Sequence, residues 1–305
     1  SSPLWSVNFP ERLQTGIVRV NENFNLLVSD SYPTSSFFKI RVLSNQGEVL
    51  QTATTNIPAG YGLNAVATPD GRVLYIGGID ASKGDWNGYL LRYLIKEDEI
   101  KLEWEVLAML DSYYPILDVS DDGNYVLYTE SDYTGYPMML FDSSGNKLWT
   151  KNTNYRPDGR YNLFPKISED GSYIAAVVDG KLTLFNTSGT KLWDFTPQGE
   201  IVGWDVYGKN VWLLSTPDWG SPTTYLYHFT LGGSSKQLII DKAQPTILFS
   251  KNETAFVVFF DGEMRAIDSN FDLLWKINIG ATPALRKGRN IMFSEDGEYL
   301  AIKEQ

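Results

Sequence analysis

The chain has 305 residues, of which 43% are hydrophobic and 14% aromatic, and it contains no cysteine. Its net charge of −11, without a cluster of lysine or arginine, argues against nucleic acids and anionic membrane surfaces as partners, because both are bound by dense positive charge. The lack of cysteine excludes disulfides, thiolate zinc sites, iron–sulfur clusters and thiol nucleophiles, and no apolar stretch approaches the roughly 18 residues of a membrane-spanning helix.

Two short phrases recur along the chain and divide it into repeats. The first is an Asp-Gly turn between two β-rich runs, found at residues 68–71, 120–123, 168–171 and 294–297. The second is a phrase ending in Gly-x-Lys-Leu-Trp, found at 141–149 and 185–193, with a divergent copy at 267–275. The tryptophans are 44 residues apart (193 − 149) and then 82 apart (275 − 193), close to two periods of 41. A period of about 40 to 45 residues, rich in strand formers, is typical of β-propeller blades.

Each repeat predicts a blade of four antiparallel strands, A to D, with the Asp-Gly turn between A and B and the second turn between C and D. In chain order, we expect full blades at residues 17–53, 60–106, 112–151, 158–196, 202–240 and 245–277, and then strands A and B of a seventh blade at 285–305. The stretch Pro3–Asn8 resembles Lys191–Phe195, so residues 1–9 are expected to add the outer strand of that blade, which closes the ring and removes sheet edges. The prediction is an all-β protein with a single domain, residues 1–305, that forms a seven-bladed propeller.

Strand C of the seventh blade has no evident counterpart in the sequence. The blade is then either three-stranded or completed by a neighbouring chain, so self-association stays open.

The phrase Asp142-x-x-Gly145-x-x-x-Trp149 and its copies resemble the tryptophan-docking repeats of the PQQ-like (quinoprotein) propeller superfamily, and the Asp-Gly turns equally resemble those of WD40-like propellers. The resemblance implies that each tryptophan stacks across a blade-to-blade interface and that each glycine permits a tight C–D turn. These structural roles are carried onto Trp5, Trp104, Gly145, Trp149, Gly189, Trp193 and Trp275.

The quinone chemistry of that superfamily is not expected here. Quinoprotein dehydrogenases use a calcium-bound cofactor in an eight-bladed ring, often with a disulfide of adjacent cysteines. A chain with no cysteine and seven expected blades resembles the binding-type members instead, so we expect no cofactor and no metal.

No catalytic residue can be assigned from the sequence. His228 lies in an alternating strand run, and no motif selects a pair among the 37 acidic residues. The acidic pairs of the turns, such as Asp121 and Asp122, are expected to bond their own backbone rather than calcium, because no EF-hand-like spacing follows them.

The connections of the blades predict the binding surface. The A–B and C–D turns are short and alike, whereas the B–C and D–A connections at the opposite end are expected to be long and varied. Residues that bind partners tend to lie on such loops, and aromatic residues and arginine are favoured at interface hot spots. The expected partner-binding residues are Asp85, Trp86, Tyr133, Tyr136, Tyr155, Arg156, Tyr161 and Trp219.

These observations predict a non-enzymatic binding or scaffolding module. Because the chain starts at Ser1 rather than Met and carries glycosylation sequons at Asn186 and Asn252, we expect it to be exported to the periplasm, the cell surface or the medium, where its partner is a protein or a glycan. Two alternatives remain, a carbohydrate-binding or carbohydrate-active propeller and a subunit of a homopolymeric surface filament or layer.

Overall fold

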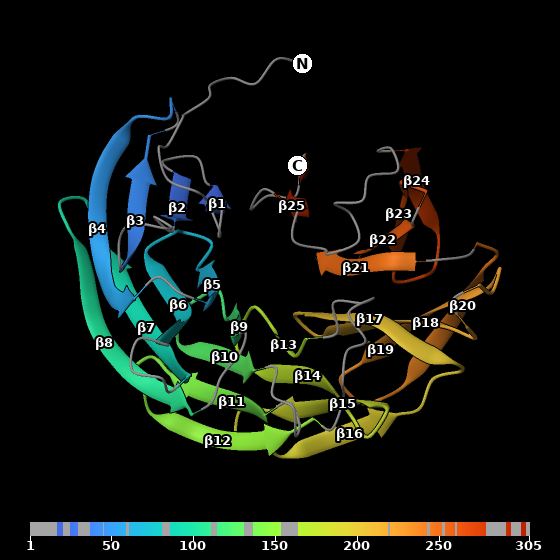
Figure 1. Ribbon diagram of the computed structural model, residues 1–305. Coiled ribbons are helices and arrows are strands. Elements are labelled where there is room, and N and C mark those ends of the chain that lie inside the picture. Colours follow the sequence, from blue (N-terminus) through green and yellow to red (C-terminus); the bar gives the residue numbers. More distant parts are fainter. Residues whose placement is uncertain are drawn as a thin grey trace. The chain divides into compact units, whose positions relative to one another are not determined.

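The structure is a computed structural model that describes residues 17–20, 25–29, 37–44, 46–58, 61–80, 86–110, 115–130, 137–153, 164–218, 220–242, 245–251, 254–259, 261–278, 291–293 and 300–302. All regular structure in these ranges is β-strand, as the arrows of Figure 1 show. This confirms the predicted all-β class. No helix in the described ranges is long and apolar enough to cross a membrane.

The chain divides into two compact units, and the first comprises residues 1–152. It holds three four-stranded antiparallel sheets. The first sheet is β1 (Ile17–Val20), β2 (Asn25–Ser29), β3 (Phe37–Leu43) and β4 (Val49–Pro58). The second is β5 (Tyr61–Ala67), β6 (Val73–Asp80), β7 (Asn87–Ile95) and β8 (Ile100–Met109). The third is β9 (Pro115–Val119), β10 (Tyr125–Glu130), β11 (Pro137–Asp142) and β12 (Lys147–Asn152).

The second unit comprises residues 153–305 and holds three further four-stranded sheets and one two-stranded sheet. The fourth sheet is β13 (Lys166–Ile167), β14 (Tyr173–Val178), β15 (Lys181–Asn186) and β16 (Lys191–Phe195). The fifth is β17 (Glu200–Tyr207), β18 (Asn210–Thr216), β19 (Thr224–Thr230) and β20 (Ser235–Ile240). The sixth is β21 (Pro245–Lys251), β22 (Thr254–Phe259), β23 (Glu263–Asp268) and β24 (Leu273–Asn278), and the seventh is β25 (Ile291–Phe293) and β26 (Leu300–Ile302).

Each four-stranded sheet runs A-B-C-D in chain order, with every neighbouring pair antiparallel. Because antiparallel strands alternate in direction, the A–B and C–D turns lie at one end of a sheet and the B–C and D–A connections at the other. The closing strand expected at residues 1–9, including Trp5, lies outside the described residues. The closed ring, the blade count and the single domain therefore stay predictions.

The inner strands form the core because both of their faces are covered. Strand β6 has seven successive buried residues, whereas the outer strand β8 alternates between exposed and partly buried positions. A strand that is buried on both faces has an uninterrupted run of apolar residues, here Val73-Leu-Tyr-Ile. A strand with one solvated face has apolar and polar residues in alternation. In the second unit, one cluster joins the fourth to the sixth sheets through Leu184, Trp204 and Val257.

Strand D carries a β-bulge at the same place in five of the six four-stranded sheets. The bulge leaves one residue without a partner in strand C and turns the next side chain to the sheet face. That next side chain is Gln51, Trp104, Trp149, Trp193 or Trp275. The tryptophan of the repeated phrase is thus the first residue after a bulge.

In the first, second and fourth sheets, this side chain reaches the C–D turn of the following sheet. The indole nitrogen of Trp104 donates to the carbonyl of Ser143 at 2.8 Å, and that of Trp193 to the carbonyl of Leu231 at 3.1 Å. Gln51 makes the equivalent contact, because its amide nitrogen donates to the carbonyls of Lys96 and Glu97 at 2.8 and 2.6 Å.

The glycine of the turn lets the turn lie flat on the indole. Gly145 has a φ of +83°, and a Cβ added there would stand 3.1 Å from Cδ2 of Trp104. Gly233 has a φ of +78° and would meet Cγ of Trp193 at 3.2 Å. Any side chain here would be strained in φ and crowd the ring. Gly189 adopts the same conformation in the β15–β16 turn, with a φ of 78°.

Strand D of the fifth sheet has no such bulge. The C–D turn of the sixth sheet differs correspondingly. Lys236 stands opposite His228 in the fifth sheet, at the place taken by tryptophan in the repeat. The following C–D turn carries Phe271 at the position of the glycine, with a φ of 71°, and its ring packs edge-on against Trp212 at 6.2 Å. Between the fifth and sixth sheets, the large aromatic residue therefore lies in the C–D turn instead of in strand D.

Candidate binding face

The polar groups of the A–B turns are used within the turns themselves. In the third sheet, Asp122 accepts hydrogen bonds from the Ser120 hydroxyl at 2.7 Å and from the backbone N–H of Asn124 at 2.9 Å. Asp170 accepts the same bonds from Ser168 and Ser172 in the fourth sheet. Burial raises the pKa of Asp170, but these hydrogen bonds outweigh it, so that the pKa lies below its ordinary value. Asp122 and Asp170 therefore act as turn-forming groups.

At the opposite end of the sheets, some B–C connections are long, as predicted, and others are short. Long B–C connections follow β2, β6, β10 and β18, as the sequence predicts. The B–C connections of the fourth and sixth sheets are instead short, the Asp179–Gly180 turn and residues 260–262. An Asp-Gly pair supplies the two positive φ values of a tight hairpin turn, here 50° and 75°. In each sheet, we call the end that carries the B–C and D–A connections its loop face.

Most of the expected partner-binding residues fall outside the described part of the chain. These are Asp85, Tyr133, Tyr136, Tyr155, Arg156, Tyr161 and Trp219. Trp86 is described, lies directly before β7 and is partly buried. The role of this set in binding stays a prediction.

The connection between β18 and β19 is tied together by its own hydrogen bonds. The hydroxyl of Thr216 donates to the carbonyls of Asp218 and Thr223 at 2.8 and 3.2 Å, and Asp218 accepts from the N–H of Gly220 at 2.9 Å. These bonds link Thr216 to Thr223 across the connection and fix the backbone of Asp218 and Gly220.

The D–A connection before β17 is held against the same loop. Ser215 donates to the carbonyl of Gln198 at 2.7 Å, and the N–H of Gln198 donates to the hydroxyl of Tyr227 at 3.1 Å. A Cβ on Gly199 would lie 2.2 Å from the carbonyl oxygen of Thr216, so the two segments are in backbone contact.

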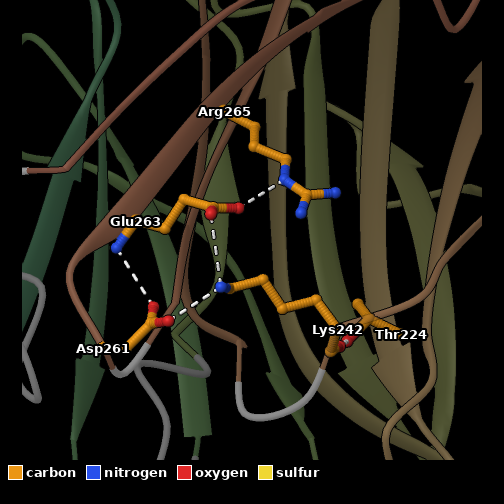
Figure 2. Close-up of polar contacts among 5 residues, drawn as sticks. All are labelled: Thr224, Lys242, Asp261, Glu263 and Arg265. Carbon is orange, nitrogen blue, oxygen red and sulfur yellow. Dashed lines mark hydrogen bonds and ion pairs between the residues drawn. The ribbon is translucent and has the colours of Figure 1, made fainter.

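A cluster of four charged side chains lies at the loop face of the sixth sheet (Figure 2). The ammonium of Lys242, in the D–A connection, pairs with Asp261 at 2.7 Å and with Glu263 at 3.3 Å. Glu263 also accepts from Nε of Arg265 at 2.7 Å. The buried hydroxyl of Thr224 donates to the carbonyl of Lys242 at 2.7 Å and anchors the connection to β19. We call Lys242, Asp261, Glu263 and Arg265 the charged cluster.

The charged cluster sits on an apolar base. The ring of Phe259 is fully buried, and both cations lie over it, with Nζ of Lys242 at 5.4 Å and Cζ of Arg265 at 5.3 Å from the ring centroid. A cation over an aromatic face is attracted by the ring quadrupole. Phe259 therefore helps to position both cationic side chains over the sheet.

The cluster stabilises the charged forms of its members. The hydrogen bond from Lys242 is the main cause of the lowered pKa of Asp261. Burial raises the pKa of Glu263, but hydrogen bonds from Arg265 and Lys242 outweigh it and lower the pKa. Burial likewise opposes the charge of Lys242, yet Asp261 and Glu263 together raise its pKa. All three groups are ionised at neutral pH.

Arg265 keeps capacity for a further partner. Its Nε is bonded to Glu263, and its two terminal nitrogens have no hydrogen-bond partner among the described residues. They point away from Glu263 in Figure 2. A guanidinium fixed on one edge presents its remaining N–H groups with little entropy to lose. The geometry suits recognition of an oxygen acceptor at the loop face.

The charged cluster was not predicted from the sequence. One signal was available, since Glu263 and Arg265 are separated by one residue on a strand and therefore share a face. Lys242 could not be assigned to the same cluster from the sequence. It lies in the connection between β20 and β21, and its contacts with the sixth sheet depend on the fold.

His228 is a packed strand residue. Its ring stacks on Trp212 at 4.3 Å, and its Nε2 lies 2.8 Å from the amide oxygen of Asn210.

No protein-family model and no curated protein sequence matches the chain. Solved structures do match it in three dimensions. A functionally unknown protein from Desulfotomaculum acetoxidans superposes with a TM-score of 0.62 at 12% identity, over 92% of this chain and 89% of that one. Hydrazine synthase from Kuenenia stuttgartiensis gives 0.57 at 14% identity, over 97% and 95% of the two chains. BamB from Moraxella catarrhalis gives 0.51 at 13% identity, over 91% and 77%.

At these identities the likeness shows the fold alone. Hydrazine synthase and BamB are propellers of the PQQ-like and WD40-like type. Together with the four-stranded antiparallel sheets, the likeness shows that this chain has a β-propeller fold.

Proposed function

We propose that the protein is a non-enzymatic binding module that holds a partner protein on its loop face. The anchors are Trp86, Tyr133, Tyr136 and Trp219, and Arg265 adds a polar contact. Aromatic residues and arginine make the largest contributions to protein interfaces, because they bury much area and lose little entropy.

One observation carries this proposal, the difference between the two ends of the sheets. In the A–B turns, the carboxylates of Asp122 and Asp170 bond their own turns and have little left to offer a partner. The loop face instead carries the longer connections and the charged cluster, where Lys242, Glu263 and Arg265 are 20 to 23% exposed and Asp261 is 60% exposed. Binding chemistry is thus available at the loop face.

We further propose that the protein works outside the cytoplasm, in the periplasm or at the cell surface. The sequons at Asn186 and Asn252 motivate this proposal. The proposed partner is a protein of the same compartment. Fractionation of the native cells tests the location, and recovery of the chain in the cytosolic fraction would contradict it.

Affinity capture tests the proposed function. The baits are the intact chain and a variant with alanine at Trp86, Tyr133, Tyr136 and Trp219, each incubated with the native envelope and extracellular fractions. We expect a protein that is retained by the intact chain and lost by at least tenfold with the variant, since hot-spot anchors each cost more than about 1 kcal/mol when truncated.

One control variant makes the result decisive. A variant with alanine at Ser143 and Ser144, in the β11–β12 turn at the opposite end of its sheet, should capture the same protein as the intact chain. Equal capture by all three baits would overturn the proposal, and retention of a glycan alone would replace it by the carbohydrate-binding alternative.

A further inference from the structure

Two cationic side chains stand directly opposite each other on the outer strands of the sixth sheet, close to its loop face. Arg265 on β23 pairs with Lys276 on β24 in the antiparallel register, so the two side chains lie on the same face of the sheet. Like charges in directly opposed positions of two strands repel each other and destabilise the sheet. An anion bound between the two cations would remove this repulsion.

Both cations have bonding capacity to spare. Glu263 accepts from Nε of Arg265 at 2.7 Å, whereas the two terminal nitrogens of Arg265 have no hydrogen-bond partner among the described residues. Lys276 is exposed and forms no ion pair in the described part of the chain. The carboxylate of Glu263 therefore serves one edge of the guanidinium and leaves its terminal nitrogens and the neighbouring ammonium open.

The connections at this end of the sixth sheet do not supply the missing anion. They are residues 241–244, 260–262 and 279–290. Their two acidic residues are Asp241 and Asp261. Asp261 is paired with Lys242, and Asp241 is exposed and forms no ion pair with any cation of the described ranges. The longest connection, which follows β24, has three basic residues and no acidic one.

The site suits a carboxylate better than a phosphate. Cζ of Arg265 lies 5.3 Å from the ring centroid of buried Phe259, and the terminal nitrogens point away from Glu263 (Figure 2). The planar fork of a guanidinium so held matches the two oxygens of a carboxylate. The charged cluster and Lys276 together hold three cations and two carboxylates, so one monoanion balances them. A dianionic phosphate would overcompensate this charge and be repelled by Asp261 and Glu263.

We propose that Arg265 and Lys276 bind the carboxylate of an aspartate or glutamate side chain of the partner protein. The two terminal nitrogens of Arg265 donate to its two oxygens, and the ammonium of Lys276 donates to one of them from the neighbouring strand. This inference rests on the proposed function, because the carboxylate belongs to the protein held at the loop face. It assigns a preference to that face, for an acidic residue over a neutral amide or a phosphate.

A capped glycine–glutamate–glycine peptide is a suitable probe, because it needs no partner protein. It is titrated at low salt into the full chain labelled with ¹⁵N, and the Nε–H signal of Arg265 is assigned by Arg265→Lys. We expect a saturable shift of this signal and of the backbone signals of β23 and β24. The same peptide with glutamine in place of glutamate should cause no shift, and with phosphoserine it should bind more weakly.

Three variants separate carboxylate binding from general attraction to positive charge. Arg265→Lys keeps the charge but lacks the planar fork, so the dissociation constant of the glutamate peptide should rise about tenfold or more. Lys276→Gln should raise it about threefold, since an exposed ion pair contributes less. Lys209→Gln, which changes an exposed lysine in the β17–β18 turn, should leave it unchanged.

Lys276→Glu tests the site without a ligand. It places a carboxylate opposite Arg265, so the urea midpoint of unfolding should lie at a higher concentration than that of Lys276→Gln, and the glutamate peptide should no longer shift the Arg265 signal. Equal shifts with the glutamate and glutamine peptides, tighter binding of the phosphoserine peptide, or unchanged affinity in Arg265→Lys would overturn the inference and leave the proposed function standing. Binding of the glutamate peptide by a chain that captures no protein would instead overturn the assignment of the carboxylate to a partner protein.

Discussion

Trp193 and Trp275 take the same place after a β-bulge, yet they have different surroundings. Trp193 donates to Leu231 and lies against Gly233, whereas Trp275 is 38% exposed and has Phe256 of its own sheet as its aromatic neighbour. The same residue type should therefore contribute differently to stability at the two sites.

We expect Trp193→Phe to lower the free energy of unfolding by about 1 kcal/mol, through loss of the hydrogen bond. Trp193→Ala should cost about 3 kcal/mol or more, because it also empties the packing site. The same changes at Trp275 should cost less than half as much. Urea unfolding followed by circular dichroism measures all four, and equal losses at both sites would contradict the assigned contacts.

Two glycines with positive φ provide a second comparison. Gly199 and Gly180 have φ values of +80° and +75°, but a Cβ would clash with the Thr216 backbone at Gly199 and would meet nothing within 4 Å at Gly180. Gly180→Ala should cost about 1 kcal/mol, the strain of a left-handed residue. Gly199→Ala should cost at least twice that in the same unfolding assay, and a cost no larger than that at Gly180 would show that the two segments are not in contact.

At the scale of the element, the four-stranded sheets were predictable because their signals are local. An Asp-Gly turn and the alternation of apolar residues need a few neighbouring positions, and both are present around Gly123 and Gly171. The short B–C connections of the fourth and sixth sheets were predicted wrongly, although Asp179-Gly180 is itself a hairpin signal.

The charged cluster illustrates what sequence patterns could not show. Glu263 and Arg265 are near in sequence, but Lys242 lies two strands earlier and reaches them through a connection anchored by Thr224. Such a contact depends on how two sheets pack.

The charged cluster also predicts a dependence of stability on pH. Asp261 and Glu263 have pKa values below their ordinary 3.8 and 4.5, so their contribution is present above those values and is lost as the pH falls through the lower folded-state pKa values. Lys242 has a raised pKa, so its contribution persists below its ordinary 10.5 and is lost as the pH rises through the higher folded-state value.

Lys242→Gln tests this dependence. We expect the variant to be less stable than the parent chain at pH 7, and the difference in unfolding free energy to shrink as the pH is lowered from 6 to 3. Lys209→Gln, which changes an exposed lysine in the β17–β18 turn, is the control and should show no such trend. A constant difference between Lys242→Gln and the parent chain across this range would show that the ion pairs do not stabilise the fold.

At the scale of the whole molecule, the repeat period led to the propeller fold, and the solved structures share that fold at 12 to 14% identity. The period was informative because one blade cannot bury its faces alone, so each copy must keep its strand and turn residues. No comparable constraint fixes the spacing of residues that bind a partner. The eight expected partner-binding residues are spread over several connections, and Trp86 is the member that the described ranges include.

The proposed function requires that a protein partner binds at the loop face of the sheets. Hydrogen–deuterium exchange on the full chain, with and without the captured partner, tests it most directly. We expect slower exchange at residues 81–86, 131–136, 154–163 and 217–223, and unchanged exchange in the A–B and C–D turns. Protection confined to the turns around Gly71, Gly123 and Gly145 would contradict the claim and place the partner at the other end of the sheets.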